Sequence, residues 1–342
     1  MPITIRDVAK AAGVSPMSVS RVLHGRGANV RVSEETAELI RKVAIDLDYH
    51  PNALARSFRQ RRTKAISLVF EAMPEIGAGS RYFSDLLDGV TTASFQRGYS
   101  VTLCSSMMGP SALTSFRDGR FDGLIWCRNS QDIELLTAIE RSQLPVVVLH
   151  ELPSGREETM SHVIWDNRAA SVSAVQHLLG LGHKRILFVI SSTGLQNTES
   201  HIRFDAFRQA MQDAGLPIEL RDRVIWSDDC REFADWWATK PPHTAAIVWN
   251  EAVAGALLLQ ATANGVTVPT ELSVISYDST SACEMMVPRL TALRQPLVEM
   301  AAKAATMLID HLESETFVAN HVIYPCRLDL RSSTGVPRPT SP

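Results

Sequence analysis

Residues 14–23 read VSPMSVSRVL and have the pattern of a short two-faced helix. The apolar residues recur at i, i+3 and i+4 and form one stripe: Val19, Val22 and Leu23. Met17 and Arg21 are four residues apart and share the opposite face. Ser15 is a favoured N-cap and Pro16 suits the first helical position. The stretch therefore predicts a helix from Pro16 whose outer face is available for contacts.

The flanking sequence predicts two further helices. Thr4 followed by Asp7 can cap a first helix, which Gly13 then ends. Ser33 opens a third helix with an acidic first turn. Its predicted core residues are Leu39, Ile40, Val43 and Leu47. Two short helices joined at a glycine, followed by a third, predict an all-α helix-turn-helix unit.

In a helix-turn-helix unit the second helix enters the major groove of DNA by its N-terminal end. Pro16, Met17 and Arg21 are therefore predicted to meet base edges, Arg21 on guanine and Met17 on a thymine methyl. Ser18 and Ser20 are predicted to hold phosphates. A plain helical hairpin is the alternative.

Charge is distributed unevenly along the chain. Residues 1–64 hold 12 of the 34 basic residues but only 6 of the 37 acidic ones, although the whole chain has a net charge of −3. A basic leader on an acidic body is typical of a nucleic-acid-binding module attached to another domain. An ordinary solvated surface is the alternative, and the helix pattern favours the DNA-binding interpretation.

Length and composition limit the class of protein. A chain of 342 residues with 45% apolar and 21% charged residues is typical of a soluble protein with two or three domains. No apolar run reaches the ~20 residues of a membrane helix, and the start MPITIRDVAKAAG lacks a signal-peptide core, so we expect a cytoplasmic protein. The five cysteines have no C-x-x-C spacing and are expected to be buried reduced thiols, with no metal or cofactor.

Residues 51–63 predict a conditional hinge. Asn52 can cap a helix through Arg59, which is shorter than the ~12–15 residues that an isolated helix needs in water. If two copies meet over DNA, Arg56 and Arg59 can contact phosphates and Phe58 can part a base step. A charged linker is the alternative.

From Lys64 onward, strands alternate with amphipathic helices, which predicts parallel α/β sheets. The predicted strands are 65–70, 100–104, 123–127, 145–150, 162–165, 185–190, 245–249 and 272–277. Ligands in such folds bind beyond the carboxyl ends of the strands. The candidates there are Tyr82, Phe83, His150, Asp166, Trp226, Asn250 and Asp278. Asp166 and Asn250 are equally suited to capping the helices that follow them.

Four segments together resemble the LacI/GalR family of bacterial transcription regulators: TIRDVAKAAGVSPMSVSRVL, RVSEETAELIRKVAIDLDYHPNALARSFRQRRTKAISLV, DNRAASVSAVQHLLGLGHKRILFV and VPTELSVISYDSTSACEMMVPRLTALRQP. The resemblance extends to about Leu330. It implies a helix-turn-helix domain at 1–50, a hinge helix and linker at 51–63, and a two-lobed type I periplasmic-binding-protein-like effector domain at 64–330. The first lobe would take 64–165 with 294–318, and the second 166–293 with 319–330.

The resemblance also implies a homodimer on a near-palindromic operator, with a small ligand between the lobes. Arg203 matches the arginine that grips the ligand, Asn250 and Asp278 match polar ligand contacts, and Trp226 matches a stacking aromatic. Tyr82 and Phe83 match the aromatic pair that opens the first lobe's helix. The predicted DNA-contacting residues are completed by Thr4, Ser15, Arg26, Asn29, Arg31 and Asn52.

These residues favour a repressor controlled by a sugar or sugar derivative, because forked donors and charged acceptors suit vicinal hydroxyls. His150 stands where sugar-responsive members usually have aspartate, which favours a negatively charged or differently hydroxylated ligand. The loop 71–81 is longer than usual, and Phe58 replaces a leucine. A nucleobase or a partner protein is the alternative effector. A transport solute-binding protein fits the basic leader poorly, and no catalytic motif indicates an enzyme.

Residues 331–342, RSSTGVPRPTSP, are rich in proline and serine and contain no leucine heptads. They are predicted to be disordered, so a dimer is favoured over a coiled-coil tetramer.

Overall fold

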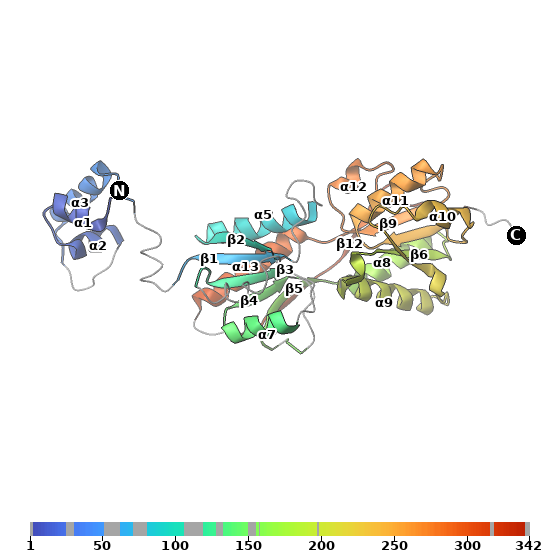
Figure 1. The fold of residues 1–342 in the computed structure, drawn as a ribbon, viewed down its shortest axis with the longest axis horizontal. Helices are drawn as coiled ribbons and strands as arrows, with labels where there is room; N and C mark the ends of the chain where they lie inside the picture. The colour runs from blue at the N-terminus through green and yellow to red at the C-terminus, as the bar shows by residue number, and fades with distance from the viewer. Residues whose placement is uncertain are drawn as a thin grey trace. The chain divides into compact units, whose positions relative to one another are not determined.

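The computed structural model describes residues 3–24, 31–50, 62–70, 81–105, 119–127, 133–149, 155–156, 158–196, 198–314 and 318–338. The chain divides into two compact units, Met1–Thr63 and Lys64–Pro342 (Figure 1). The division at residue 63 coincides with the predicted end of the linker. No helix among the described residues is long and apolar enough to cross a membrane.

The N-terminal unit contains three helices, α1 (Ile5–Ala11), α2 (Pro16–His24) and α3 (Glu34–Asp46). The predicted caps form: the Asp7 carboxylate accepts from the Thr4 backbone N–H at 2.8 Å, and the Ser33 hydroxyl oxygen accepts from the Thr36 N–H. The core contains Val8, Val19 and Ile40. Leu39 was predicted to be a core residue, and this is wrong: it is 47% exposed because the α3 stripe is centred on Ile40.

The first lobe of the larger unit is a parallel sheet in the order β11-β5-β4-β3-β1-β2. Its strands are β1 (Ala65–Phe70), β2 (Ser100–Ser105), β3 (Gly123–Cys127), β4 (Val146–Leu149), β5 (Ser161–Trp165) and β11 (His321–Tyr324). Its helices are α5 (Arg81–Gln96), α7 (Ile133–Ser142) and α13 (Leu297–Glu313). β1, β3 and β4 are buried along most of their length, as expected of strands covered on both faces.

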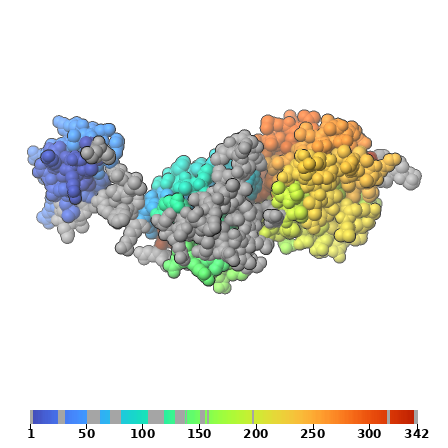
Figure 2. Space-filling view, viewed as in Figure 1, coloured from blue at the N-terminus to red at the C-terminus, as the bar shows by residue number. Residues whose placement is uncertain are grey.

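The second lobe is a sheet in the order β12-β10-β9-β8-β6-β7, in which β12 alone is antiparallel among the described strands. Its strands are β6 (Ile186–Ser191), β7 (Arg223–Trp226), β8 (Ala245–Val248), β9 (Ser273–Tyr277), β10 (Thr291–Arg294) and β12 (Arg327–Asp329). Its helices are α8 (Asn167–Gly180), α9 (Thr198–Asp213), α10 (Phe233–Ala238), α11 (Glu251–Ala263) and α12 (Ala282–Met285). In Figure 2 the face that this lobe turns toward the viewer is coloured mainly yellow to orange, the segment that contains α10 and α11.

The chain passes between the two sheets three times, after β5, after β10 and after β11 (Figure 1). The predicted share of residues 319–330 is therefore wrong for β11, because His321–Tyr324 pairs with β5 in the first lobe. Only β12, at Arg327–Asp329, belongs to the second lobe. Two short apolar strands at sheet edges have similar patterns, so their sequences do not distinguish the sheets they join.

Helix α13 packs against α5 and against the first lobe's sheet. Gly89 makes the close approach of the two helices possible, because a Cβ there would meet the Val298 carbonyl oxygen and lie 2.8 Å from the Ala301 Cβ. At the C-terminal end of α13, Glu313 accepts a hydrogen bond from Lys64 Nζ at 2.9 Å. The first residue of the larger unit is thus bound to the end of this helix.

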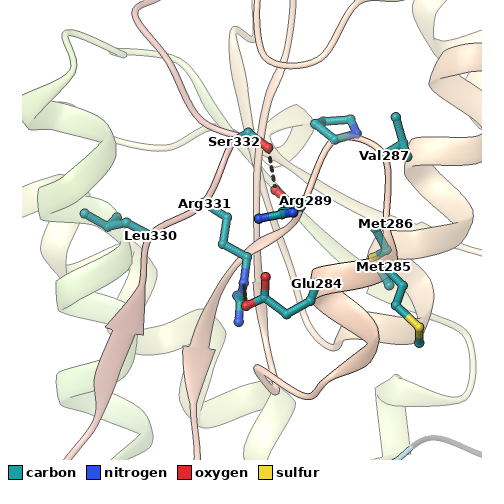
Figure 3. Close-up of a pocket in the computed structure, with 9 residues that line it drawn as sticks. Glu284, Met285, Met286, Val287, Arg289, Leu330, Arg331 and Ser332 are labelled. Carbon is teal, nitrogen blue, oxygen red and sulfur yellow. Dashed lines mark hydrogen bonds and ion pairs between the residues drawn. The ribbon is translucent and has the colours of Figure 1, made fainter.

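The predicted disorder of the tail is wrong for residues 331–338, which pack on the second lobe. The Ser333 hydroxyl donates to the Val274 carbonyl at 2.6 Å and accepts from the Thr291 N–H at 2.8 Å. Arg331 forms an ion pair with Glu284 at 2.6 Å, visible in Figure 3. The polar composition of the tail suggested disorder. Here, however, the serine and arginine side chains form hydrogen bonds with residues of the second lobe, and these bonds order the segment.

We expect Ser333→Ala to destabilise the second lobe by about 1–3 kcal/mol, because it leaves a buried N–H and a buried carbonyl without their partner. Urea unfolding followed by tryptophan fluorescence measures the effect. The matched control is Ser332→Ala at the neighbouring exposed position, which should leave the midpoint unchanged. Equal midpoints for the two variants would contradict the ordered tail.

Candidate functional site

Arg203 is the centre of a buried polar cluster in the second lobe. It lies on α9 and is 2% exposed. Its Nε donates to Asn167 Oδ1 at 2.8 Å and its Nη1 donates to the Trp249 carbonyl oxygen at 2.7 Å. The guanidinium carbon lies 4.4 Å from the centroid of the Tyr277 ring. The predicted gripping arginine is therefore held rigidly at the carboxyl ends of the strands.

Two buried carboxylates complete the charge around Arg203. Its Nη2 lies 3.6 Å from Glu199 Oε2 and 3.8 Å from Asp278 Oδ1. Asp278, with a left-handed backbone φ of +66°, also accepts a hydrogen bond from the Gln295 amide. Among the described residues, one guanidinium and two carboxylates lie together in a buried environment, so the carboxylates outnumber the cation there.

Tyr82 brings the first lobe to the same cluster. It lies on α5, and its pKa is raised well above the ordinary value, first by burial and then by neighbours that include the Glu199 and Asp278 carboxylates. Phe83 follows it and places its ring edge-on to Phe70 at 5.5 Å between centroids. Of the predicted ligand residues, the structure thus brings Arg203 and Asp278 together, and Tyr82 is close enough for their charges to affect the pKa of its hydroxyl.

Two other predicted ligand residues have structural partners. Asn250 caps α11, its side-chain oxygen accepting from the Val253 N–H at 2.9 Å. Trp226 is 5% exposed, with its ring 6.1 Å from that of Phe233 and 5.5 Å from that of Trp236. This packing offers a ligand little of the indole face, and the predicted stacking role stays a prediction. His150 lies outside the described residues.

Several residues of the cluster were not predicted from the sequence: Trp165, Asn167, Glu199, Trp249, Tyr277 and Gln295. A local signal existed for Glu199, which precedes Arg203 by four residues and therefore shares its helix face. The other residues come from separate elements, and only the folded chain brings them to Arg203.

A separate pocket of about 660 Å³ lies between α12 and residues 330–332 (Figure 3). Met285 and Val287 on its rim are exposed. The pocket contains none of the predicted ligand residues, so it is distinct from the Arg203 cluster. Among the described residues no group of three His, Cys, Asp or Glu side chains could hold a metal ion. The five cysteines are free, and four of them are buried.

The second helix of the N-terminal unit has the predicted two faces. Val19 is fully buried, whereas Met17 is 61% exposed and Pro16 beside it is exposed. The Ser15 hydroxyl oxygen accepts from the Ser18 N–H at 3.0 Å, which caps the helix as predicted. Within the N-terminal unit, the side chains of Pro16 and Met17 at the start of α2 are therefore exposed to solvent.

Ser20 and Arg21 are half-buried, and Thr4 and Arg31 are exposed. The remaining predicted DNA contacts lie outside the described residues: Arg26, Asn29, Asn52, Arg56, Phe58 and Arg59. Their predicted roles are untested by the structure.

Comparisons with known proteins agree with both units. Residues 4–52 match the model of bacterial regulatory proteins of the lacI family, and residues 175–334 match a periplasmic binding protein-like domain. The solved Lac repressor dimer bound to operator and the anti-inducer ONPF is similar in fold, with a TM-score of 0.83 and 22% identity over 98% of this chain and 100% of that one. The transcriptional regulator CelR in complex with cellobiose has a TM-score of 0.73 and 24% identity, over 97% and 99% of the two chains.

The HTH-type transcriptional regulator DegA of Bacillus subtilis (strain 168) is 30% identical over 352 residues. The match covers 98% of this chain and 99% of DegA, so both domains are shared in the same order. Relatives of this kind are transcription regulators, not enzymes. The chain belongs to the lacI family of bacterial regulatory proteins.

Proposed function

We propose that this transcription regulator is a repressor whose affinity for operator DNA is controlled by a neutral sugar or sugar derivative bound beside Arg203. The observation that supports this most directly is the cluster itself: a guanidinium, two buried carboxylates and Tyr82 from the other lobe. Each group hydrogen-bonds well to hydroxyls, and the residues come from both lobes.

The charge of the cluster favours a neutral ligand. Glu199 and Asp278 oppose the single positive charge of Arg203 within 4 Å. A phosphate or carboxylate on the ligand would add a negative charge to buried carboxylates, which is costly in a low-dielectric site. Sugar hydroxyls can donate to both carboxylates at no charge cost. His150 favoured a negatively charged or a differently hydroxylated ligand, and the described cluster favours a neutral one.

The aromatic residue of this cluster that suits the apolar C–H face of a sugar is Tyr82, which is half-buried. Trp165 and Tyr277 are buried beside Arg203, and their rings meet edge-on at 6.1 Å. CelR, which shares this fold, is described in complex with cellobiose. A planar nucleobase fits the Tyr82–Phe83 pair as well, and the experiment below distinguishes the two classes.

DNA binding follows from the exposed end of α2 and from symmetry. Two copies of the chain place two α2 helices on the half-sites of a near-palindromic operator. The ligand changes operator affinity only by binding one lobe arrangement better than the other. A coupling of about 1–3 kcal/mol changes the affinity about 5–150-fold.

We expect Arg21→Ala to weaken binding to a selected operator about tenfold or more, because a forked arginine–guanine contact contributes about 1–3 kcal/mol of discrimination. Met17→Ala should relax the preference at one base pair. Fluorescence anisotropy against the operator and against random DNA measures both effects. Arg41→Ala on α3 removes the same charge at an exposed position, where it pairs with Glu34. The base-contact role fails if Arg41→Ala reduces operator affinity as much as Arg21→Ala does.

We expect a neutral sugar to raise the melting temperature of the protein by several degrees, because a ligand at about 100 times its Kd adds about 2.7 kcal/mol. The panel contains cellobiose, D-ribose, other neutral sugars, sugar phosphates, adenine and guanine. Arg203→Lys keeps the charge but loses the fork, and should abolish the shift.

The control for this experiment is Arg208→Lys, an exposed position on the same helix whose arginine pairs with Asp205. It should keep the full response. An Arg203-dependent shift with adenine or guanine alone would replace the sugar by a nucleobase. No response to any compound would favour a partner protein as the effector.

A further inference from the structure

Three buried hydrogen-bond donors near Arg203 have no acceptor among the described residues: Ser200 Oγ, Trp165 Nε1 and Trp249 Nε1. Ser200 is fully buried and Trp165 is 2% exposed. Buried donors in folded proteins are nearly always paired, because an unpaired one loses its hydrogen bonds to water without replacement. Three of them around one side chain therefore need an explanation.

The first donor lies on the helix face that carries the charged residues. Ser200 precedes Arg203 by three residues and follows Glu199, so all three point to the same side of α9. These three side chains are buried, whereas His201 between them is exposed. The Ser200 hydroxyl thus belongs to the inner face of the cluster.

The two tryptophans follow or end strands whose carboxyl ends lie beside the same guanidinium. Trp165 is the last residue of β5, and its ring centroid is 5.6 Å from the guanidinium carbon of Arg203. Trp249 follows β8, and its carbonyl accepts from Arg203. A Cβ on Gly194 would come within 2.8 Å of the Trp249 ring, so glycine there lets the indole lie where it does.

Other polar groups beside Arg203 are hydrogen-bonded, so the three unpaired donors are exceptions in their surroundings. The Ser171 hydroxyl lies 2.6 Å from the Tyr277 hydroxyl and 3.0 Å from the Arg203 carbonyl oxygen. Arg203 itself is satisfied by Asn167 and Trp249. The unpaired groups are all N–H or O–H donors, and what they lack is an oxygen acceptor.

We propose that Ser200 and the indole N–H groups of Trp165 and Trp249 are specificity-determining donors to the ligand. The inference rests on the proposed function and adds a requirement on the ligand. The oxygens of the ligand must accept hydrogen bonds from these three donors, and its hydroxyl groups must donate hydrogen bonds to Glu199 and Asp278. Hydroxyl groups do both, so the ligand class is a compound with several adjacent hydroxyls, and replacing one of them by hydrogen should be strongly disfavoured.

The first test needs no ligand and uses the full-length chain. An unpaired buried hydroxyl contributes no stability, so Ser200→Ala should melt at the same temperature as the unaltered protein or higher. Ser171→Ala is the matched control, a buried serine on α8 with three hydrogen bonds, and it should melt lower. If Ser200→Ala loses as much stability as Ser171→Ala, the hydroxyl has a structural partner and the proposal is overturned.

The second test measures binding of cellobiose and D-ribose by calorimetry. Trp165→Phe keeps an aromatic ring and removes only the donor, and we expect it and Ser200→Ala each to weaken binding about tenfold. Trp237→Phe, in the other aromatic cluster of the second lobe, should bind as the unaltered chain does.

The outcomes separate this inference from the proposed function. Unchanged affinity in Trp165→Phe and Ser200→Ala, together with loss of binding in Arg203→Lys, would overturn the donor assignment and keep the sugar site. If neither sugar nor any other neutral hydroxylated compound binds the unaltered chain, the proposed function fails and the donor assignment fails with it.

Discussion

The buried guanidinium of Arg203 is the interaction on which the second lobe depends. A buried charge is stable only when its partners are complete, and those partners come from α8, α9 and the ends of β8 and β9. Arg203 therefore fixes the positions of four separate elements at one edge of the sheet. Burial raises the pKa of Tyr277 to about 12, so the ring beneath the guanidinium stays neutral and its hydroxyl keeps its contact with Ser171.

The same edge of the sheet combines stability with recognition. Asp166 and Asn250 cap the helices that follow β5 and β8, and in doing so they hold the backbone of Trp165 and Trp249 in place. A residue that caps a helix at a strand end is close to any ligand bound there. For this reason the capping role and the ligand role of Asn250 are compatible, although only the first is visible in the structure.

Local periodicity predicted the longer elements but missed four short strands among the described residues, β7, β10, β11 and β12. All eight predicted strands are present with ends shifted by at most a residue, and α2 and α3 begin where Pro16 and Ser33 indicated. Two predictions that depended on long-range pairing were wrong. Residues 321–324 were assigned to the second lobe but pair with β5 in the first, and residues 331–338 were expected to be disordered but pack on the second lobe. In the site, Arg203 and Asp278 were predicted by resemblance. Trp165, Ser200 and Trp249 could not be predicted as site residues from the sequence. They were identified because their donors have no hydrogen-bond partner in the folded chain, and no sequence pattern reports that.

Helix α13 has a mechanical consequence for the whole larger unit. Just before it, Gln295 donates to Asp278 beside Arg203, and at its end Glu313 accepts a hydrogen bond from Lys64, where the linker from the N-terminal unit ends. Its 17 residues form a stiff rod about 25 Å long. A rod fixed near one end acts as a lever: a tilt of about 5° at the ligand end displaces the linker end by about 2 Å. A movement too small to disturb the packing around Asp278 would thus be magnified at the residue where the linker joins the body.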